Sequence, residues 1–165
     1  KREDEFVISL NERGVILEYC KIRNKELAQL YFAIFVKRGV TDFEFPLMTL
    51  INDIEDIEIL KEYLTREKLD DFYSVDSRTK GKINFSSELN KIYYIDASDN
   101  EYNLFSPPNR IFQTFYVSIV KLKTMKEWLI QLNDANGLGD QYEATLLGYS
   151  LEGLIRRVLF VTKEK

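Results

Sequence analysis

The sequence predicts an α+β fold in which a bent antiparallel β-sheet is capped by a helix at 124–134 and carries an inserted acidic helical segment at about 46–73. Three observations predict it. Short segments rich in β-branched and aromatic residues alternate with turn residues, as strands do. Residues 46–73 instead place apolar side chains three or four positions apart, which is the period of a helix. A Thr-x-x-Glu sequence that starts at Thr124 matches the capping box of a helix N-terminus.

Composition excludes several kinds of active site. The chain has 165 residues, no histidine and a single cysteine, Cys20. Histidine-based catalysis, imidazole metal sites and thiolate zinc clusters therefore lack their essential groups. One cysteine cannot form an internal disulfide, which favours a reducing compartment. We expect a cytoplasmic binding protein that is not an enzyme and that needs no cofactor and no metal.

The length suits one domain, which we assign to residues 1–137. Residues 138–165 are predicted to form a helical extension or the start of a linker to a further domain. The longest unbroken apolar run, at 30–36, is seven residues long. About 20 are needed to cross a bilayer, so no transmembrane helix is expected.

The N-terminal part begins with strand patterns and then becomes ambiguous. Residues 14–20 are rich in β-branched and aromatic side chains and predict a strand. Residues 27–36 leave two alternatives open, because Asn24 suits the cap of a helix that begins at Lys25, while the apolar run also suits a buried strand.

The helical segment at 46–73 lies in the most acidic part of the chain. Residues 44–76 contain ten acidic and three basic residues, a net charge of −7. Because the whole chain carries −4, the remainder carries +3. The pattern therefore predicts a mildly basic body with an acidic insert.

The C-terminal half predicts short strands at 82–85, 91–96 and 101–106. Residues 110–122 fit both a strand and a helix, and their β-branched and aromatic content favours the strand. The helix that begins at Thr124 is predicted to present one apolar stripe, made of Met125, Trp128, Leu129 and Leu132.

This order of elements resembles a pleckstrin-homology (PH) domain. Residues 14–18 through 31–35 look like the family's first hairpin, with the aromatic pair that opens its second strand. Residues 102–110 look like its sixth strand and the following turn. Residues 126–132 look like its capping helix, with Trp128 where the family places a tryptophan.

The resemblance implies a seven-stranded, strongly bent sheet whose open end holds a phosphoinositide headgroup by basic side chains. The positions that match are Lys21, Arg23 and Lys25 in the first-hairpin loop, Arg110 in the turn after the sixth strand, and Lys37 and Arg38 near the end of the next strand. Glu18 and Leu30 stand where headgroup-binding members carry basic residues, which argues against tight, stereospecific lipid binding.

We therefore expect a non-enzymatic binding module of a larger intracellular protein, such as a signalling scaffold. It would dock to a protein partner, or weakly and peripherally to anionic phosphoinositide membranes. Nucleic-acid binding is not expected from a net negative chain. The alternative is a stand-alone acidic inhibitor or immunity-type protein that binds a basic partner through the 44–76 surface. Its candidate residues are Asp53, Glu55, Asp56, Glu58 and Glu62.

Overall fold

The computed structural model describes residues 5–12, 15–132 and 143–144. The chain divides into two compact units. Unit 1 comprises Lys1–Thr41 and Trp128–Lys165, and unit 2 comprises Asp42–Glu127. The predicted boundary at residue 137 and the predicted extension at 138–165 lie outside the described residues except for 143–144.

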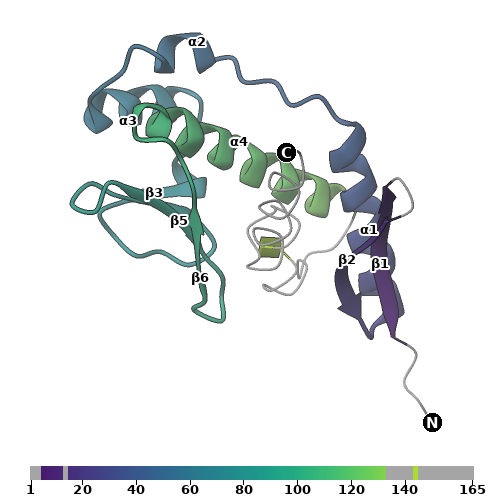
Figure 1. Cartoon of the computed structure of the whole chain (residues 1–165). Helices are drawn as coiled ribbons and strands as arrows, with labels where there is room; N and C mark the ends of the chain where they lie inside the picture. The colour runs from purple at the N-terminus through teal and green to yellow at the C-terminus, as the bar shows by residue number, and fades with distance from the viewer. Residues whose placement is uncertain (1–4, 13–14, 133–142, 145–165) are drawn as a thin grey trace, which may run out of the picture. The chain divides into compact units, whose positions relative to one another are not determined.

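The described chain is mixed α+β, which confirms the predicted class (Figure 1). Its strands form two open sheets, one of two strands and one of four, rather than a single bent antiparallel sheet. No helix in the described ranges is both long and apolar enough to cross a bilayer.

Unit 1 contains an antiparallel hairpin. Strand β1 (Phe6–Glu12) pairs with strand β2 (Val15–Ile22), so the strand predicted at 14–20 is confirmed. Its partner is not the one that the PH resemblance gave. The predicted second strand at 31–35 is helical, and the pairing strand precedes β2 in the sequence.

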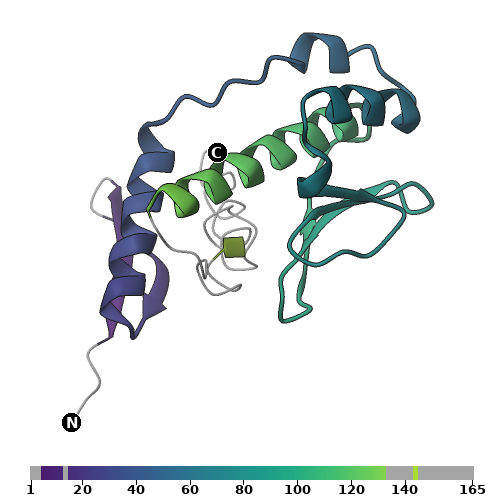
Figure 2. The ribbon, with the colours of Figure 1, turned by 180° about the vertical axis from the view of Figure 1, so that it is seen from behind.

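Helix α1 (Lys25–Val40) covers this hairpin, as Figure 2 shows. It resolves the alternatives left open for 27–36 in favour of the helix. The Oδ1 atom of Asn24 accepts a hydrogen bond from the Leu27 amide at 3.0 Å, which satisfies one free donor of the first turn. Glu26 in the first turn and Lys37 and Arg38 in the last turn have the signs that the helix dipole favours.

Unit 2 begins with short helices in the segment predicted to be helical at 46–73. They are α2 (Met48–Ile51), α3 (Ile57–Arg66) and a 3₁₀ turn at Asp70–Phe72. The helical assignment is confirmed, but the segment consists of separate pieces. Leu60 and Leu64, one turn apart on α3, are fully buried, while the carboxylates of the segment are exposed.

A four-stranded sheet follows in the order β3 (Tyr73–Val75), β4 (Ile83–Ser86), β5 (Lys91–Ile95) and β6 (Glu101–Leu104). The strands predicted at 82–85, 91–96 and 101–106 are therefore confirmed. Strands β3 and β4 are parallel, and the other pairs are antiparallel. A parallel pair normally needs a long crossover, but a strand of three residues spans only about 10 Å, which the connecting loop can retrace.

Helix α4 (Ile111–Gln131) lies against one face of this sheet. The Phe115 ring makes edge and tilted contacts with the rings of Tyr73 and Phe85, at centroid distances of 5.8 and 5.6 Å. The interpretation of 110–122 as a strand is therefore wrong. The helix start predicted at Thr124 is wrong as well, because Thr124 lies inside α4 and its hydroxyl donates to the Val120 carbonyl.

Candidate binding surfaces

The described residues contain no group of three or more histidine, cysteine, aspartate or glutamate side chains arranged to hold a metal ion. The features that remain for a functional site are exposed surfaces. Two of them contain residues that the sequence analysis singled out, and a third was not foreseen.

The basic residues predicted to lie in one hairpin loop flank a helix instead. Lys21 is in β2, Arg23 precedes α1, and Lys25 is the first residue of α1. The hairpin turn is at the other end of β2, between Glu12 and Val15. The predicted hairpin-loop site is therefore wrong in its placement.

The other predicted basic residues are distant from these or belong to the other unit. Lys37 and Arg38 lie in the last turn of α1, about 18 Å along the helix axis from Lys25. The Lys37 ammonium is 4.8 Å from the centre of the Trp128 ring, a cation–π contact within unit 1. Arg110 ends a 3₁₀ turn in unit 2. No single headgroup can contact both ends of α1.

An apolar stripe runs along α1 between its basic ends. Phe32, Val36 and Val40 are four residues apart and are 52%, 43% and 79% exposed. At 3.6 residues per turn, Lys25 falls on the same face of the helix. The buried face is the one that contains Tyr31 and Ile34, and Ala28, one turn before Phe32, is buried as well. We call the set Lys25, Phe32, Val36, Lys37 and Val40 the basic surface.

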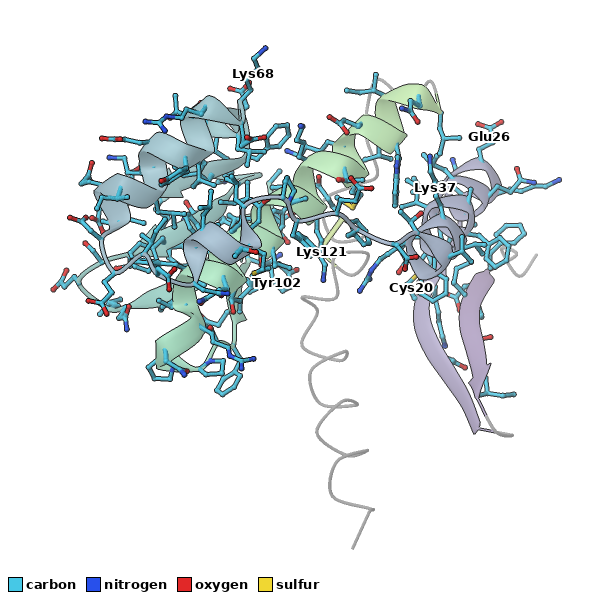
Figure 3. All side chains as sticks on the ribbon, turned by 90° about the horizontal axis from the view of Figure 1, so that it is seen from above. Cys20, Glu26, Lys37, Lys68, Tyr102 and Lys121 are labelled. Carbon is cyan, nitrogen blue, oxygen red and sulfur yellow. The ribbon has the colours of Figure 1, made fainter. Side chains whose placement is uncertain are left out.

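Charge is concentrated around this stripe. Residues 21–40 contain five basic residues and one acidic residue, Glu26, a net charge of +4 in a chain that is negative overall. The side chains of Glu26 and Lys37 extend from α1 in Figure 3. Lys21 is partly neutralised, because its ammonium is 3.7 Å from the Glu18 carboxylate. The surface thus combines apolar area with an excess of cations.

The predicted acidic residues lie on and just before α3, and all five are exposed. Three have local partners. Asp56 caps α3 by accepting the Glu58 amide, the Glu58 carboxylate pairs with Lys61 at 2.8 Å, and Glu62 is 3.7 Å from Arg66.

Two acids and one apolar side chain complete this second surface. Within the described chain, Asp53 and Glu55 make no ion pair, and Ile59 is 48% exposed among the carboxylates. We call the set Asp53, Glu55, Asp56, Glu58, Ile59 and Glu62 the acidic surface. Residues 53–67 carry six acidic and two basic residues, a net charge of −4.

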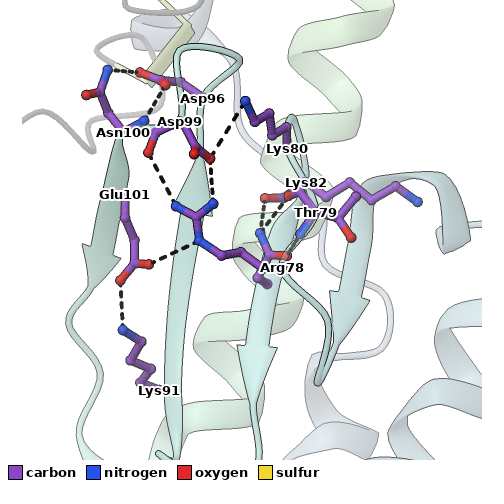
Figure 4. Close-up of polar contacts among 10 residues, drawn as sticks. Arg78, Thr79, Lys80, Lys82, Lys91, Asp96, Asp99, Asn100 and Glu101 are labelled. Atoms are coloured by element: carbon purple, nitrogen blue, oxygen red, sulfur yellow. Dashed lines mark hydrogen bonds and ion pairs between the residues drawn. The ribbon is translucent and has the colours of Figure 1, made fainter.

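The third feature is a polar network at one end of the four-stranded sheet (Figure 4). Arg78 and Lys80, in the loop before β4, both pair with Asp99, and Lys91 pairs with Glu101 at 2.7 Å. Because these charges compensate one another within the network, we interpret it as a device that joins two loops. Sequence reasoning missed it, since the pairing partners are 10 to 21 residues apart and lie on different strands and loops.

A buried carboxylate anchors the turn in this network. Asp96 accepts hydrogen bonds from the backbone and side-chain nitrogens of Asn100 and from the Tyr102 hydroxyl, at 2.8 to 2.9 Å. Burial acts to raise the pKa of Asp96, but these hydrogen bonds outweigh it and lower the pKa. Burial and then the bond to Asp96 raise the pKa of Tyr102 to about 12. The pair is a structural clamp.

The comparisons with known proteins give no family for this chain: no family model, no curated protein and no solved structure matches it. The function must therefore be argued from the surfaces themselves.

Proposed function

We propose that this chain is a non-enzymatic binding module that docks to an acidic protein partner through the basic surface of α1. The observation that carries the proposal is the stripe of Phe32, Val36 and Val40, which is exposed on a helix whose other face is already packed. A helix that is apolar on two faces favours a second covering element.

The chemistry of the partner follows from the charges at the two ends of the stripe. Lys25 and Lys37 are about 18 Å apart along the axis, so an extended partner can contact both while a single phosphate group cannot. Acidic side chains on such a partner would be attracted by the net +4 of residues 21–40.

A photo-crosslinking experiment tests this proposal. A photoreactive residue replaces Phe32 in the full chain, and a second preparation carries it at Glu88, an exposed site outside both surfaces. We expect a protein adduct only from position 32. The adduct should be lost when Lys25→Glu and Val36→Glu are added, because these changes reverse one charge and interrupt the stripe.

Two results would contradict the proposal. One is equal labelling from positions 32 and 88, or labelling that the double change leaves intact. The other is flotation of the chain with phosphatidylserine or phosphoinositide vesicles that salt and the same double change abolish. The second result would replace the protein partner with an anionic membrane.

The acidic surface supports a second candidate, a protein that binds a basic partner. Ile59 is half exposed among carboxylates, two of which make no ion pair within the described chain. The matching variant is Asp53→Lys with Glu55→Lys, which should abolish capture of a basic partner by the full chain while the unfolding midpoint stays unchanged.

A further inference from the structure

The basic and acidic surfaces have opposite charge on one chain, and each exposes large apolar side chains. Residues 21–40 carry +4 and residues 53–67 carry −4. The apolar groups are Phe32, Val36 and Val40 on the first and Ile59 on the second. This inference rests on the proposed function, because it identifies the occupant of the same α1 face.

We propose that the basic surface of one copy of this chain binds the acidic surface of a second copy, head to tail. Charge complementarity selects a contact between the unlike surfaces over a contact between like ones. A two-fold pairing of α1 with α1 brings the lysines of both copies into one interface, and a pairing of α3 with α3 does the same with carboxylates. Like charges facing each other across an interface are unfavourable.

The available groups fit a helix-on-helix contact. The apolar stripe from Phe32 to Val40 is about 12 Å long on a helix of about 24 Å, and the ten residues of α3 span about 15 Å, so α3 can lie along α1 and cover the stripe. Ile59 is the apolar group of α3 that meets Phe32 and Val36. Asp53 and Glu55, which make no ion pair in the described chain, are available to lysines of the other copy.

The arrangement has a defined consequence for assembly. In a head-to-tail contact each copy keeps one unused surface, so addition continues until a ring closes or a chain of copies forms. A contact of this size between two helices is small, and we expect a dissociation constant on the order of micromolar. Salt should weaken it, because the attracting charges are exposed.

Sedimentation velocity of the full chain tests the proposal over a range of concentrations. We expect species larger than a monomer that grow with concentration and shrink at high salt. The basic-surface variant, Lys25→Glu with Val36→Glu, and the acidic-surface variant, Asp53→Lys with Glu55→Lys, should each weaken self-association at least ten-fold. The control Glu88→Lys has the same charge change as Glu55→Lys and should leave it unchanged.

Mixing the two variants gives the decisive result. The basic-surface variant keeps an intact acidic surface, and the acidic-surface variant keeps an intact basic one. The mixture should therefore associate, at least as a 1:1 dimer. Either variant alone should stay monomeric. Unchanged unfolding midpoints would show that both variants fold.

Three outcomes overturn the second-copy proposal: a wild type that is monomeric at every concentration, a variant that still dimerises alone, and a mixture that stays monomeric. The proposed function fails separately. If the wild type is monomeric while position 32 still crosslinks a different protein, the α1 face is a docking site with another occupant. If position 32 labels nothing, both proposals fail.

Discussion

Unit 2 buries its apolar side chains from several directions, whereas the described part of unit 1 packs one helix on one hairpin. In unit 2 the rings of Phe115 and Tyr116 on α4 are fully buried, with partners in β3, β4 and the segment that leads into α2. In unit 1 the α1 face away from the hairpin leaves Val40 79% exposed. Unit 2 therefore has a densely packed aromatic core, whereas α1 of unit 1 has an apolar face that is exposed in the described structure.

Unit 2 also contains buried polar side chains whose hydrogen bonds are satisfied. The amide of Asn84, fully buried in unit 2, bonds Thr79 through both its oxygen and its nitrogen, and also the Lys82 carbonyl. Asp96 is satisfied in the same way. Buried polar groups that find all their partners specify one arrangement of the loops around them. Unit 2 thus has the features of a rigid scaffold.

The largest effect is expected in the core of unit 2. Phe115→Ala removes a fully buried ring that contacts Tyr73 and Phe85, and we expect a loss of about 3–5 kcal/mol in the free energy of unfolding. Urea unfolding measures it. The control is Phe105→Ala, at an 85% exposed ring, with an expected change within about 0.5 kcal/mol. Similar losses for both would break the contrast between core and surface.

Asp96→Asn tests the clamp. The amide has one oxygen, so it cannot accept both at the Oδ1 position, from the Asn100 backbone amide, and at the Oδ2 position, from the Asn100 side chain and the Tyr102 hydroxyl. We expect a loss of about 1–3 kcal/mol at neutral pH. The pKa of Asp96 is lowered in the folded state. Its contribution is therefore present above the ordinary carboxyl pKa of about 4 and disappears as the pH falls through the lowered value.

The difference in the free energy of unfolding between the wild type and Asp96→Asn should therefore become smaller as the pH is lowered. Urea unfolding of both proteins at neutral pH and at about pH 3 measures this difference. Subtracting the variant from the wild type removes the contributions of Asp76 and Asp99, whose pKa values are also lowered by their hydrogen bonds and ion pairs. A gap that does not depend on pH would show that the carboxylate is not the stabilising form.

Replacing two glycines by alanine should change stability in opposite directions. Gly81 has φ of +69°, a conformation in which a side chain costs about 1–2 kcal/mol, so Gly81→Ala should destabilise unit 2. Gly39 is helical, with nothing within 4 Å of an added Cβ, so Gly39→Ala should stabilise α1 by about 0.5–1 kcal/mol. The unfolding midpoint of each variant is compared with that of the wild type. Shifts in the same direction would contradict the different conformations given to Gly81 and Gly39.

A local effect on stability is expected at the start of α1. Asn24→Ala removes the acceptor for the Leu27 amide and should cost about 1 kcal/mol. Hydrogen exchange measures where the loss falls. We expect faster exchange in α1 and no change in β4 and β5. Asn24→Asp keeps the acceptor and serves as the control. A uniform effect on both units would show that they unfold together.

The elements that could be predicted are those in which one period dominates. The acidic segment at 46–73 has helical spacing throughout, and the short strands after residue 80 are separated by turn residues. Residues 110–122 satisfied both periods. Local β propensity favoured a strand, but the rings of Phe112 and Phe115 pack on β4 from a helix, and such tertiary contacts override propensity.

The candidate surfaces were predicted in part. The charged residues could be named because charge is visible in the sequence, but the grouping of the basic ones could not, since Lys25 and Lys37 lie at opposite ends of α1 and Arg110 lies in unit 2. The stripe of Phe32, Val36 and Val40 was missed because it exists only when 27–36 is helical. Asn24, Glu26 and Lys37 together form a cap and dipole pattern that could have decided the helix.

The order in which the two units are completed follows from their boundaries in the sequence. Unit 2 is one continuous segment, Asp42–Glu127, whereas unit 1 is formed by segments on both sides of it. During synthesis, the chain of unit 2 is complete before the second segment of unit 1, Trp128–Lys165, has been made. Domains fold as units when their chain is complete. We therefore expect unit 2 to fold before unit 1, whose second segment is made last.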